Sequence, residues 1–318
     1  MHTLKIMKND AGQRLDKFLT KHFTALPQAL MYKYIRTKHI KLNGKRCEIS
    51  TRLCEDDVLT LYIKDEFFEE AHEDEFDFLK APTAINVIYE DDNILLVDKK
   101  QGLLVHPDET YHFDSLIARI QHYLYDKGEY DPKQEASFAP ALVNRIDRNT
   151  GGLVIAAKNA ESLRILNEKM KNRDIEKYYL CVVQGIPKKK SDILVGYLEK
   201  NEKKNKVYIS RKPYEGAKTI KTEYRVIAEK NGNSLLEVHL LTGRTHQIRA
   251  HMASIGHPLI GDGKYGSNLK NREAGQKWQM LYSYKLIFNF RNDAGILNYL
   301  NGKSFAVDNV WFKKEFDI

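Results

Sequence analysis

The sequence predicts an α+β protein with a small basic N-terminal domain and a larger mixed domain. Charge is divided unevenly, because residues 1–63 carry 12 Lys/Arg against 6 Asp/Glu and residues 64–81 carry 2 against 8. From residue 85 onward, short apolar strands alternate with turns, and a helical stretch lies among them. We therefore expect three parts, a domain at 1–63, an acidic linker at 64–82 and a second domain at 83–318.

The bulk composition is that of a soluble globular protein. Of the 318 residues, 42% are hydrophobic and 30% are charged, and the longest apolar runs are far below the roughly 18 residues that cross a bilayer. The first ten residues carry no apolar signal region, and the three cysteines form no CxxC pair. We expect a cytoplasmic protein with no membrane partner. The net charge of +8 favours a polyanionic partner.

Residues 1–63 read as two helices, a hairpin and a strand. Segments 14–23 and 28–40 place apolar residues at helical spacing. Asn43-Gly44 between two short strand-like runs predicts a hairpin, and 56–64 reads as the closing strand. The inward residues are expected to be Leu15, Phe18, Leu19 and Phe23 on the first helix, and Leu30, Tyr34 and Ile35 on the second.

A basic turn ends the second helix and contains Arg36, Lys38, His39 and Lys41. Such a turn beside a hairpin edge can contact RNA phosphates without reading bases. A solvated basic face is the alternative, and charge alone does not separate the two.

The linker at 64–82 is acidic with scattered aromatic residues. His72 lies among its acids and could suggest a metal site, but we interpret the segment as a solvated charge run. It reads as a linker or as a strap lying on another surface.

The second domain contains a series of predicted strands and one predicted helix. The helix covers 160–172, with Leu163, Leu166 and Met170 on one face. Neither GxGxxG after a strand nor GxxxxGK[ST] occurs, so nucleotide-cofactor functions lose their main support. The strands are expected at 87–90, 94–99, 152–158, 178–185, 222–229 and 235–241.

The stretch "NRIDRNTGGL", residues 144–153, holds Asp147 between Arg145 and Arg148 ahead of an apolar strand. Glycines after the acid allow the backbone to come close to a ligand. Taken alone, this pattern fits a surface salt bridge as well as a catalytic carboxylate.

A second dense stretch, residues 240–266, leaves a strand, turns at Gly243 and enters a predicted helix with His246, Gln247, Arg249, His251 and Met252. With His257 it offers three histidines, but i and i+5 do not share a helix face as zinc ligands do in HExxH. No metal is expected. The glycines of "GDGKYG" could cradle a phosphate, but we favour turn positions that need positive φ.

These motifs resemble those of the RluA family of pseudouridine synthases. "RIDRNTGGLVIAAK" looks like the family's HRLDxxTSGLLL motif, and 240–266 matches a later family signature almost residue for residue. "LLVDKKQGLLVHP" and "DIEKYYLCVVQG" fit two further family motifs. The resemblance covers about 85–290. In front of it, residues 12–63 resemble an S4-type RNA-binding domain, in the order "RLDKFL", basic turn, "KLNGK" and strand.

The resemblance implies an isomerase that converts uridine in RNA to pseudouridine on a mixed, mainly antiparallel sheet, with no cofactor. It implies Asp147 as nucleophile or base at the ribose and Arg249 as its ion-pair partner. Tyr179, the second tyrosine of "KYYL", would stack on the base, with Tyr178 as the alternative. Arg145 would fill the stack that an extruded uridine vacates. RNA-binding residues are expected to be Arg145, Arg148, Arg244, Thr245, His246, Gln247, Arg36, Lys38, His39 and Lys41.

Several positions depart from the family pattern. Asn144 stands where the family has His, Ile146 replaces Leu, Gly151 replaces Ser, Asp98 stands where Asn is common, and Lys100 replaces Pro. We expect the activity to survive them.

The expected substrate is structured RNA, with large-subunit rRNA favoured over tRNA, and the expected state is a monomer. A non-catalytic RNA-binding or ribosome-assembly protein on the same fold is the alternative class.

Overall fold

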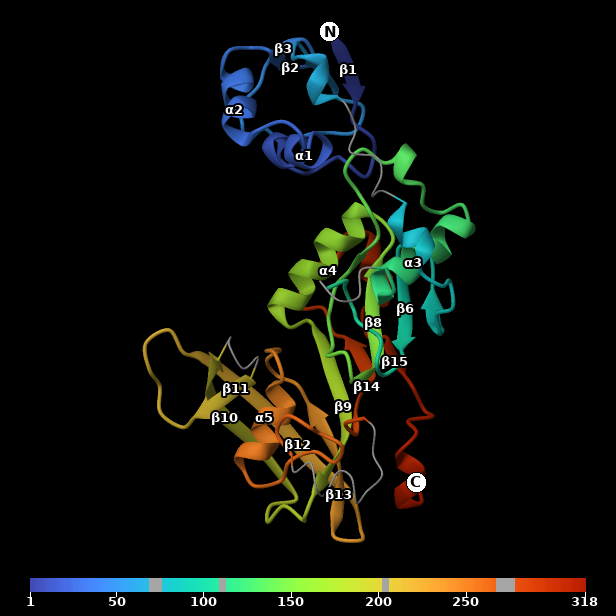
Figure 1. Ribbon diagram of the computed structural model, residues 1–318, viewed down its shortest axis with the longest axis vertical. Coiled ribbons are helices and arrows are strands. Elements are labelled where there is room, and N and C mark those ends of the chain that lie inside the picture. The colour runs from blue at the N-terminus through green and yellow to red at the C-terminus, as the bar shows by residue number, and fades with distance from the viewer. Residues whose placement is uncertain (69–75, 109–112, 202–205, 267–277) are drawn as a thin grey trace. The chain divides into compact units, whose positions relative to one another are not determined.

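A computed structural model describes most of the chain in two compact units (Figure 1). The described residues are 1–68, 76–108, 113–201, 206–266 and 278–318. Unit 1 combines residues 1–84, 107–141 and 157–164. Unit 2 combines residues 85–106, 142–156 and 165–318.

Unit 1 begins with the two helices that the sequence predicts. Helix α1 covers Leu15–His22 and α2 covers Gln28–Arg36. The apolar residues of α1 that we expected inside are fully buried, whereas Lys17 and Lys21 are exposed. In α2, Ile35 is buried, and Met31 is a buried residue that the prediction missed.

A four-stranded antiparallel sheet packs with these helices. Its order is β1-β4-β2-β3, with β1 at His2–Lys5, β2 at Ile40–Leu42, β3 at Lys45–Arg46 and β4 at Val58–Leu61. The hairpin predicted at Asn43-Gly44 joins β2 to β3. Both turn residues have positive φ, 50° and 73°, as a type I′ hairpin turn requires.

The apolar residues of 1–63 form one hydrophobic core, which includes Phe18, Met31 and Leu59. The part of the linker on either side of 69–75 forms two short 3₁₀ helices, Asp65–Phe67 and Asp77–Lys80. His72 lies outside the described residues. Unit 1 also contains α3, Leu116–Asp126, which the sequence analysis did not predict.

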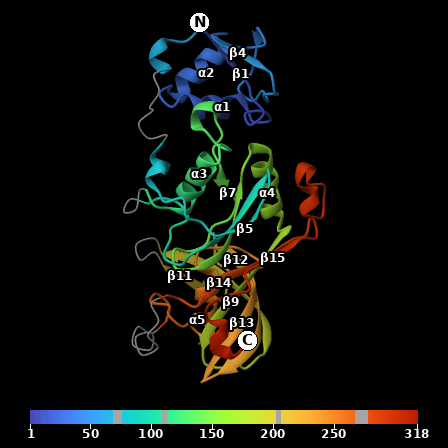
Figure 2. The ribbon, with the colours of Figure 1, turned by 90° about the vertical axis from the view of Figure 1, so that its right-hand side faces the viewer.

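Unit 2 is built on a large twisted sheet, which is eleven-stranded within the described residues (Figure 2). The main path is β11-β10-β12-β13-β9-β14-β8-β6-β5, while β15 pairs with β14 and β7 with β8. The strands are β5 Val87–Glu90, β6 Ile94–Lys99, β7 Ala141–Leu142, β8 Gly151–Ala157, β9 Ile175–Gln184, β10 Ser191–Asn201, β11 Lys206–Ser210, β12 Lys218–Lys230, β13 Asn233–His239, β14 Leu281–Phe288 and β15 Ser304–Ala306.

The sheet is mixed and mainly antiparallel, which confirms the predicted fold class. Strand β9 pairs antiparallel with β13 and β14, whereas β14 pairs parallel with β8. Every residue of β8 is buried. A strand buried on both faces needs an apolar run rather than alternation, and "GGLVIAA" supplies one.

Helices α4 and α5 flank this sheet. Helix α4 covers Ala160–Asn172, as predicted, and leads directly into β9. Helix α5 covers Gln247–Ser254 and packs against β11 and β12. The strand order therefore brings the start of β8, the start of β9 and the N-terminal end of α5 to one region of unit 2.

The described residues contain no helix that is long and apolar enough to cross a membrane.

Cys47 and Cys181 are buried, whereas Cys54 is exposed. Burial raises the pKa of both buried thiols. Short 3₁₀ helices also occur at Pro132–Gln134, Gly295–Leu300 and Lys313–Phe316.

Candidate active site

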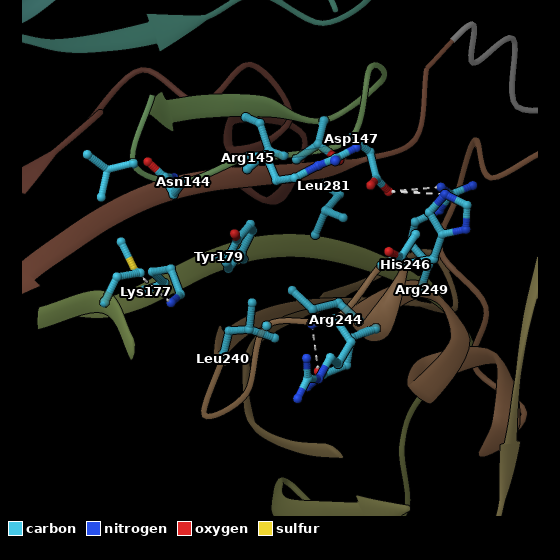
Figure 3. A pocket seen from close by; sticks show the side chains of 18 residues that line it. Asn144, Arg145, Asp147, Lys177, Tyr179, Leu240, Arg244, His246, Arg249 and Leu281 are labelled. Carbon is cyan, nitrogen blue, oxygen red and sulfur yellow. Dashed lines mark hydrogen bonds and ion pairs between the residues drawn. The ribbon is translucent and has the colours of Figure 1, made fainter. Parts of the chain in front are cut away.

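A cavity of about 320 Å³ lies in unit 2 where these elements meet (Figure 3). Three segments supply most of its wall, namely the loop before β8, the start of β9, and the turn that leads from β13 into α5. This is the size of a small-ligand pocket. The lining residues are Val143, Asn144, Arg145, Ile146, Asp147, Thr150, Met170, Lys177, Tyr179, Leu240, Gly243, Arg244, Thr245, His246, Gln247, Ile248, Arg249 and Leu281.

Asp147 and Arg249, 102 positions apart in sequence, form an ion pair in this cavity. Arg249 Nη1 donates to Asp147 Oδ2 at 3.0 Å. Arg249 is only 7% exposed, while the Asp147 side chain keeps 27% exposure. The pair that the sequence predicted is therefore present, with the acid on the accessible side.

Asp262 holds the other side of the same guanidinium. Arg249 Nε and Nη2 donate to its two carboxylate oxygens, each at 2.8 Å. Asp262 is fully buried, and burial alone would raise its pKa, but the hydrogen bonds from Arg249 hold that pKa below its ordinary value. The pKa of Arg249 is likewise held above its ordinary value by Asp262 and Asp147, against the effect of burial. Asp262 is a site residue that the sequence did not predict.

Asp262 also organises the glycine-rich loop. Its Oδ1 accepts the backbone N–H groups of Lys264 and Tyr265, and its carbonyl oxygen accepts that of Gly266. Gly261 has φ +77°, and a Cβ there would lie 2.1 Å from the Trp278 carbonyl oxygen. These amides are engaged by the protein, so the loop fits the turn interpretation rather than a phosphate cradle.

His246 lies between Asp147 and the loop. It has a left-handed backbone, φ +53°, immediately before α5. Its Nε2 lies 3.8 Å from Asp147 Oδ2, and its Nδ1 lies 3.1 Å from the Tyr265 hydroxyl. Burial lowers the pKa of His246 to about 4, so the imidazole is neutral at pH 7.

The three histidines of this stretch face different partners. His251 Nδ1 lies 2.8 Å from Thr222 Oγ1, and His257 Nδ1 lies 2.8 Å from the Gln184 carbonyl oxygen. Across the described part of the chain, no three His, Cys, Asp or Glu side chains gather as a metal-binding group.

Tyr179 lines the cavity, and Tyr178 does not. Adjacent residues of β9 point to opposite faces of the sheet, which separates the two candidates. The Tyr178 hydroxyl donates to Glu176 at 2.9 Å, and its ring stacks on His239. Tyr179 is 5% exposed, and burial raises its pKa to about 12, which keeps the phenol protonated at neutral pH.

Hydrogen bonds from Lys99 and Gln101 hold the loop that carries Asp147 in place. Lys99, 1% exposed, donates to the carbonyl oxygens of Lys100, Leu103 and Arg148 at 2.8–3.0 Å. Burial lowers the pKa of Lys99 to about 7. Gln101 Nε2 donates to the carbonyl oxygens at 149 and 279. Lys99 stands in a family motif, but the sequence predicted no role for either side chain.

Three departures from the family pattern, Asn144, Gly151 and Asp98, have a structural account. Asn144 Oδ1 accepts the N–H of Ile155, and its Nδ2 donates to the Leu153 carbonyl, so it pairs with the backbone of β8. At Gly151, a Cβ would lie 2.5 Å from the Tyr282 ring. The Tyr282 hydroxyl donates to Asp98 at 2.6 Å, so Gly151, Tyr282 and Asp98 form one packed set.

The remaining predicted RNA-binding residues fall into two groups. Arg145, Arg244 and Thr245 are exposed at the cavity, and exposed Arg148 donates to the Gly102 carbonyl from its Nε. Gln247 is 2% exposed, and its amide already makes hydrogen bonds to Lys221, Thr222, Thr242 and Arg244.

The second group lies in unit 1, where Arg36, Lys38 and His39 are exposed and Lys41 is half-buried. Their RNA-binding roles stay predictions.

This chain is similar in sequence and in fold to known proteins of one family. The profile of the family described as RNA pseudouridylate synthase matches residues 93–254, and the S4 domain profile matches residues 13–59. An uncharacterized RNA pseudouridine synthase of Mycoplasma capricolum is 32% identical over 97% of this chain and 98% of that protein. A ribosomal large subunit pseudouridine synthase C of Vibrio vulnificus is 31% identical over 80% of this chain and 77% of that protein.

Solved structures agree on the fold. Human RNA Pseudouridylate Synthase Domain Containing 1 superposes with a TM-score of 0.54 at 20% identity, over 66% of this chain and 81% of that one. The chain therefore belongs to the RNA pseudouridylate synthase family, as an RluA-type member with an N-terminal S4 domain, and it is an RNA pseudouridine synthase.

Proposed function

We propose that the enzyme isomerises specific uridines of large-subunit rRNA, and that Asp147 attacks or deprotonates the ribose of a uridine extruded into the cavity. The reaction breaks the C1′–N1 bond, rotates the base and joins C1′ to C5. The hydrogen at C5 leaves as a proton, and N1 takes up a proton. One carboxylate suffices for such chemistry at the ribose. The observation that carries the proposal is the Asp147–Arg249 ion pair in a cavity that also contains Tyr179.

Each of the other proposed roles follows from position and chemistry. Tyr179 presents a protonated phenol and a ring at the cavity wall, suited to stacking on the base. Arg145 is an exposed planar cation two positions before Asp147, suited to filling the stack that the uridine leaves.

The choice of rRNA over tRNA is supported by relatives. The Vibrio vulnificus protein is named a ribosomal large subunit pseudouridine synthase C, and a protein of Borreliella burgdorferi, 30% identical over 86% of this chain, is named synthase D.

We further propose an S4 domain at 1–63, a linker at 64–82 and a catalytic domain at 83–318, acting as a cytoplasmic monomer without a metal.

The test is tritium release from transcripts labelled at uridine C5. We expect the wild-type protein to release tritium from large-subunit rRNA and not from tRNA, and Asp147→Asn to bind the same RNA without release. Release from tRNA alone would overturn the choice of substrate. Release by Asp147→Asn at the wild-type rate would overturn the role of the carboxylate.

A further inference from the structure

A second hollow lies in unit 2, at the corner where α4 ends and β9 begins. It has a volume of about 490 Å³ and is lined by Lys171, Asn172, Arg173, Asn289 and Arg291. We name these five residues the α4–β9 cleft. Three of them are cations, two are amides and none is an acid. Asn289 donates to Glu176 and Arg291 pairs with Asp174, so Lys171 and Arg173 carry the positive charge of the cleft.

Two buried charged residues, Asp174 and Lys169, hold together the segments that line the cleft. Asp174 is 1% exposed and accepts from Arg291 Nε at 2.7 Å. Lys169 is 2% exposed and donates to the carbonyl oxygens of Asn292 and Asp293 at 2.6 and 2.9 Å. These contacts join the end of α4 to the segment after β14, so the cleft is preformed rather than assembled by a ligand.

Compensation of the helix dipole accounts for only part of this charge. A cation in the last turn of α4, such as Lys171, is stabilised by the negative end of the helix. Arg173 lies beyond the helix at φ +62°, a backbone position that usually carries glycine or asparagine. Arg291 comes from a separate segment of the chain. Arg291 is explained by its ion pair with Asp174 and by its hydrogen bond to the Asn172 carbonyl oxygen. The presence of Arg173 beside Lys171 requires another explanation.

The α4–β9 cleft adjoins the active-site cavity through one short stretch of chain. Met170 and Lys177 line that cavity, and Lys177 Nζ lies 3.3 Å from Met170 Sδ. Residues 171–173 lie between them in sequence. Burial lowers the pKa of Lys177, and the nearby charge of Arg173 lowers it further. Figure 3 shows Lys177 at the end of the cavity opposite the Asp147–Arg249 pair.

We propose that the α4–β9 cleft binds backbone phosphates of the RNA strand that leaves the cavity at its Lys177 end. This inference rests on the proposed function, because it needs a target uridine at Asp147. RNA phosphates match the two exposed cations Lys171 and Arg173, since Lys and Arg neutralise phosphate charge. The cleft would thereby fix the direction of the strand without reading its sequence.

The test removes two exposed charges of the cleft and keeps the buried contacts of Lys169 and Asp174. The variant is Lys171→Gln/Arg173→Gln, because Arg291 pairs with buried Asp174 and its removal would leave that acid uncompensated. The matched control is Lys188→Gln/Lys189→Gln, which loses the same charge beyond the other end of β9, a strand of about 30 Å. Circular dichroism and Tm verify that both variants fold.

Affinity for the rRNA transcript is measured between about 50 and 200 mM salt, together with tritium release. We expect the cleft variant to bind about tenfold more weakly, with the slope of log Kd against log salt reduced by roughly 1.4, two single-strand phosphates at ~0.7 each. KM should rise while kcat at saturating RNA stays unchanged. The control should change much less.

Equal losses in the cleft variant and the control would overturn the proposal, since they would reflect net charge alone. An unchanged slope in the cleft variant, with Tm raised by inorganic phosphate only in the wild type, would make the cleft a small-anion site and also overturn it. Tritium release by the wild type checks the proposed function separately, because it does not depend on these residues.

Discussion

At the scale of single residues, one guanidinium organises the site. Asp262 takes two donors of Arg249 and leaves Nη1 for Asp147. Because Asp262 is fully buried and also accepts two backbone N–H groups of its own loop, it cannot move without moving that loop. Asp262 is therefore a positioning residue, and the direction of Arg249 depends on it.

We expect Asp262→Asn to lower both stability and turnover. The amide would present an N–H group to one donor of Arg249, and breaking a buried ion pair costs about 3 kcal/mol or more. Urea unfolding measures the first effect, and tritium release at saturating RNA measures the second. Asp262→Glu tests geometry with the charge kept. Full activity of Asp262→Asn would contradict the positioning role.

The same carboxylate predicts a dependence of stability on pH. The pKa of Asp262 in the folded protein is below its ordinary value of 3.8, so the unfolded chain binds the proton more readily. The stabilisation is fully present above about pH 4 and is lost as pH falls through the folded pKa. We expect the difference in unfolding free energy between wild type and Asp262→Asn to be constant from pH 7 to 5 and to shrink towards pH 3. Urea titrations at each pH measure it, and a constant difference down to pH 3 would contradict the assignment.

At the scale of secondary-structure elements, the parallel pair β8–β14 supports the loop that carries Asp147. Gly151 pairs with Tyr282 and Gly152 with Ser283. A Cβ at Gly152, which has φ +116°, would lie 2.2 Å from the Ser283 carbonyl oxygen. The glycines are needed because the partner strand fills the space where side chains would stand.

We expect Gly151→Ser, which restores the usual family residue, to destabilise this protein by roughly 1–3 kcal/mol through overpacking against the Tyr282 ring. The double variant Gly151→Ser/Tyr282→Leu should be more stable than the sum of its single variants, because the smaller side chain vacates the space. Thermal unfolding of the four proteins in a double-mutant cycle gives the coupling. Additive effects would show that the ring and the serine do not compete.

The elements were more predictable from the sequence than the contacts between them. Segment 94–99 reads as an apolar run and is β6, and 160–172 has helical spacing and is α4. The paired ribbon β10–β11 was missed, because its half-exposed strands carry charged and polar residues at many positions.

Within the site, motif resemblance predicted the pairing of Asp147 with Arg249, which the structure bears out. Local pattern could not reveal that Asp262 shares the guanidinium, since an Asp between two glycines reads as a turn residue. Nor could it reveal that Lys99 is buried against three carbonyl groups contributed by two separate segments. Tertiary packing alone creates both arrangements.

At the scale of the whole molecule, positive charge is available in both units. The basic turn of unit 1 contains Arg36, Lys38 and Lys41, and the cavity of unit 2 is lined by Arg145 and Arg244. Binding that depends on many phosphate contacts weakens steeply with salt. The S4 domain should therefore contribute affinity, while the residues around Asp147 should determine turnover.

We expect Arg36→Gln/Lys38→Gln/Lys41→Gln to reduce the salt slope of RNA binding by roughly 2.1–2.7, which corresponds to three phosphates at ~0.7–0.9 each, and to leave kcat at saturating RNA unchanged. Filter binding over a salt series measures the slope. The control is Lys80→Gln/Lys127→Gln/Lys133→Gln, which loses the same charge in unit 1 outside residues 1–63. A slope equal to that of the wild type would mean that the basic turn is a solvated face.

The distribution of thiols gives the molecule a built-in reporter position. Of the three cysteines, only Cys54 is exposed, and it lies in the loop just before β4, whereas Cys47 and Cys181 are buried. A maleimide dye should therefore attach at one place without any engineered cysteine. Fluorescence anisotropy of that single label would follow the arrival of RNA at the N-terminal domain in real time.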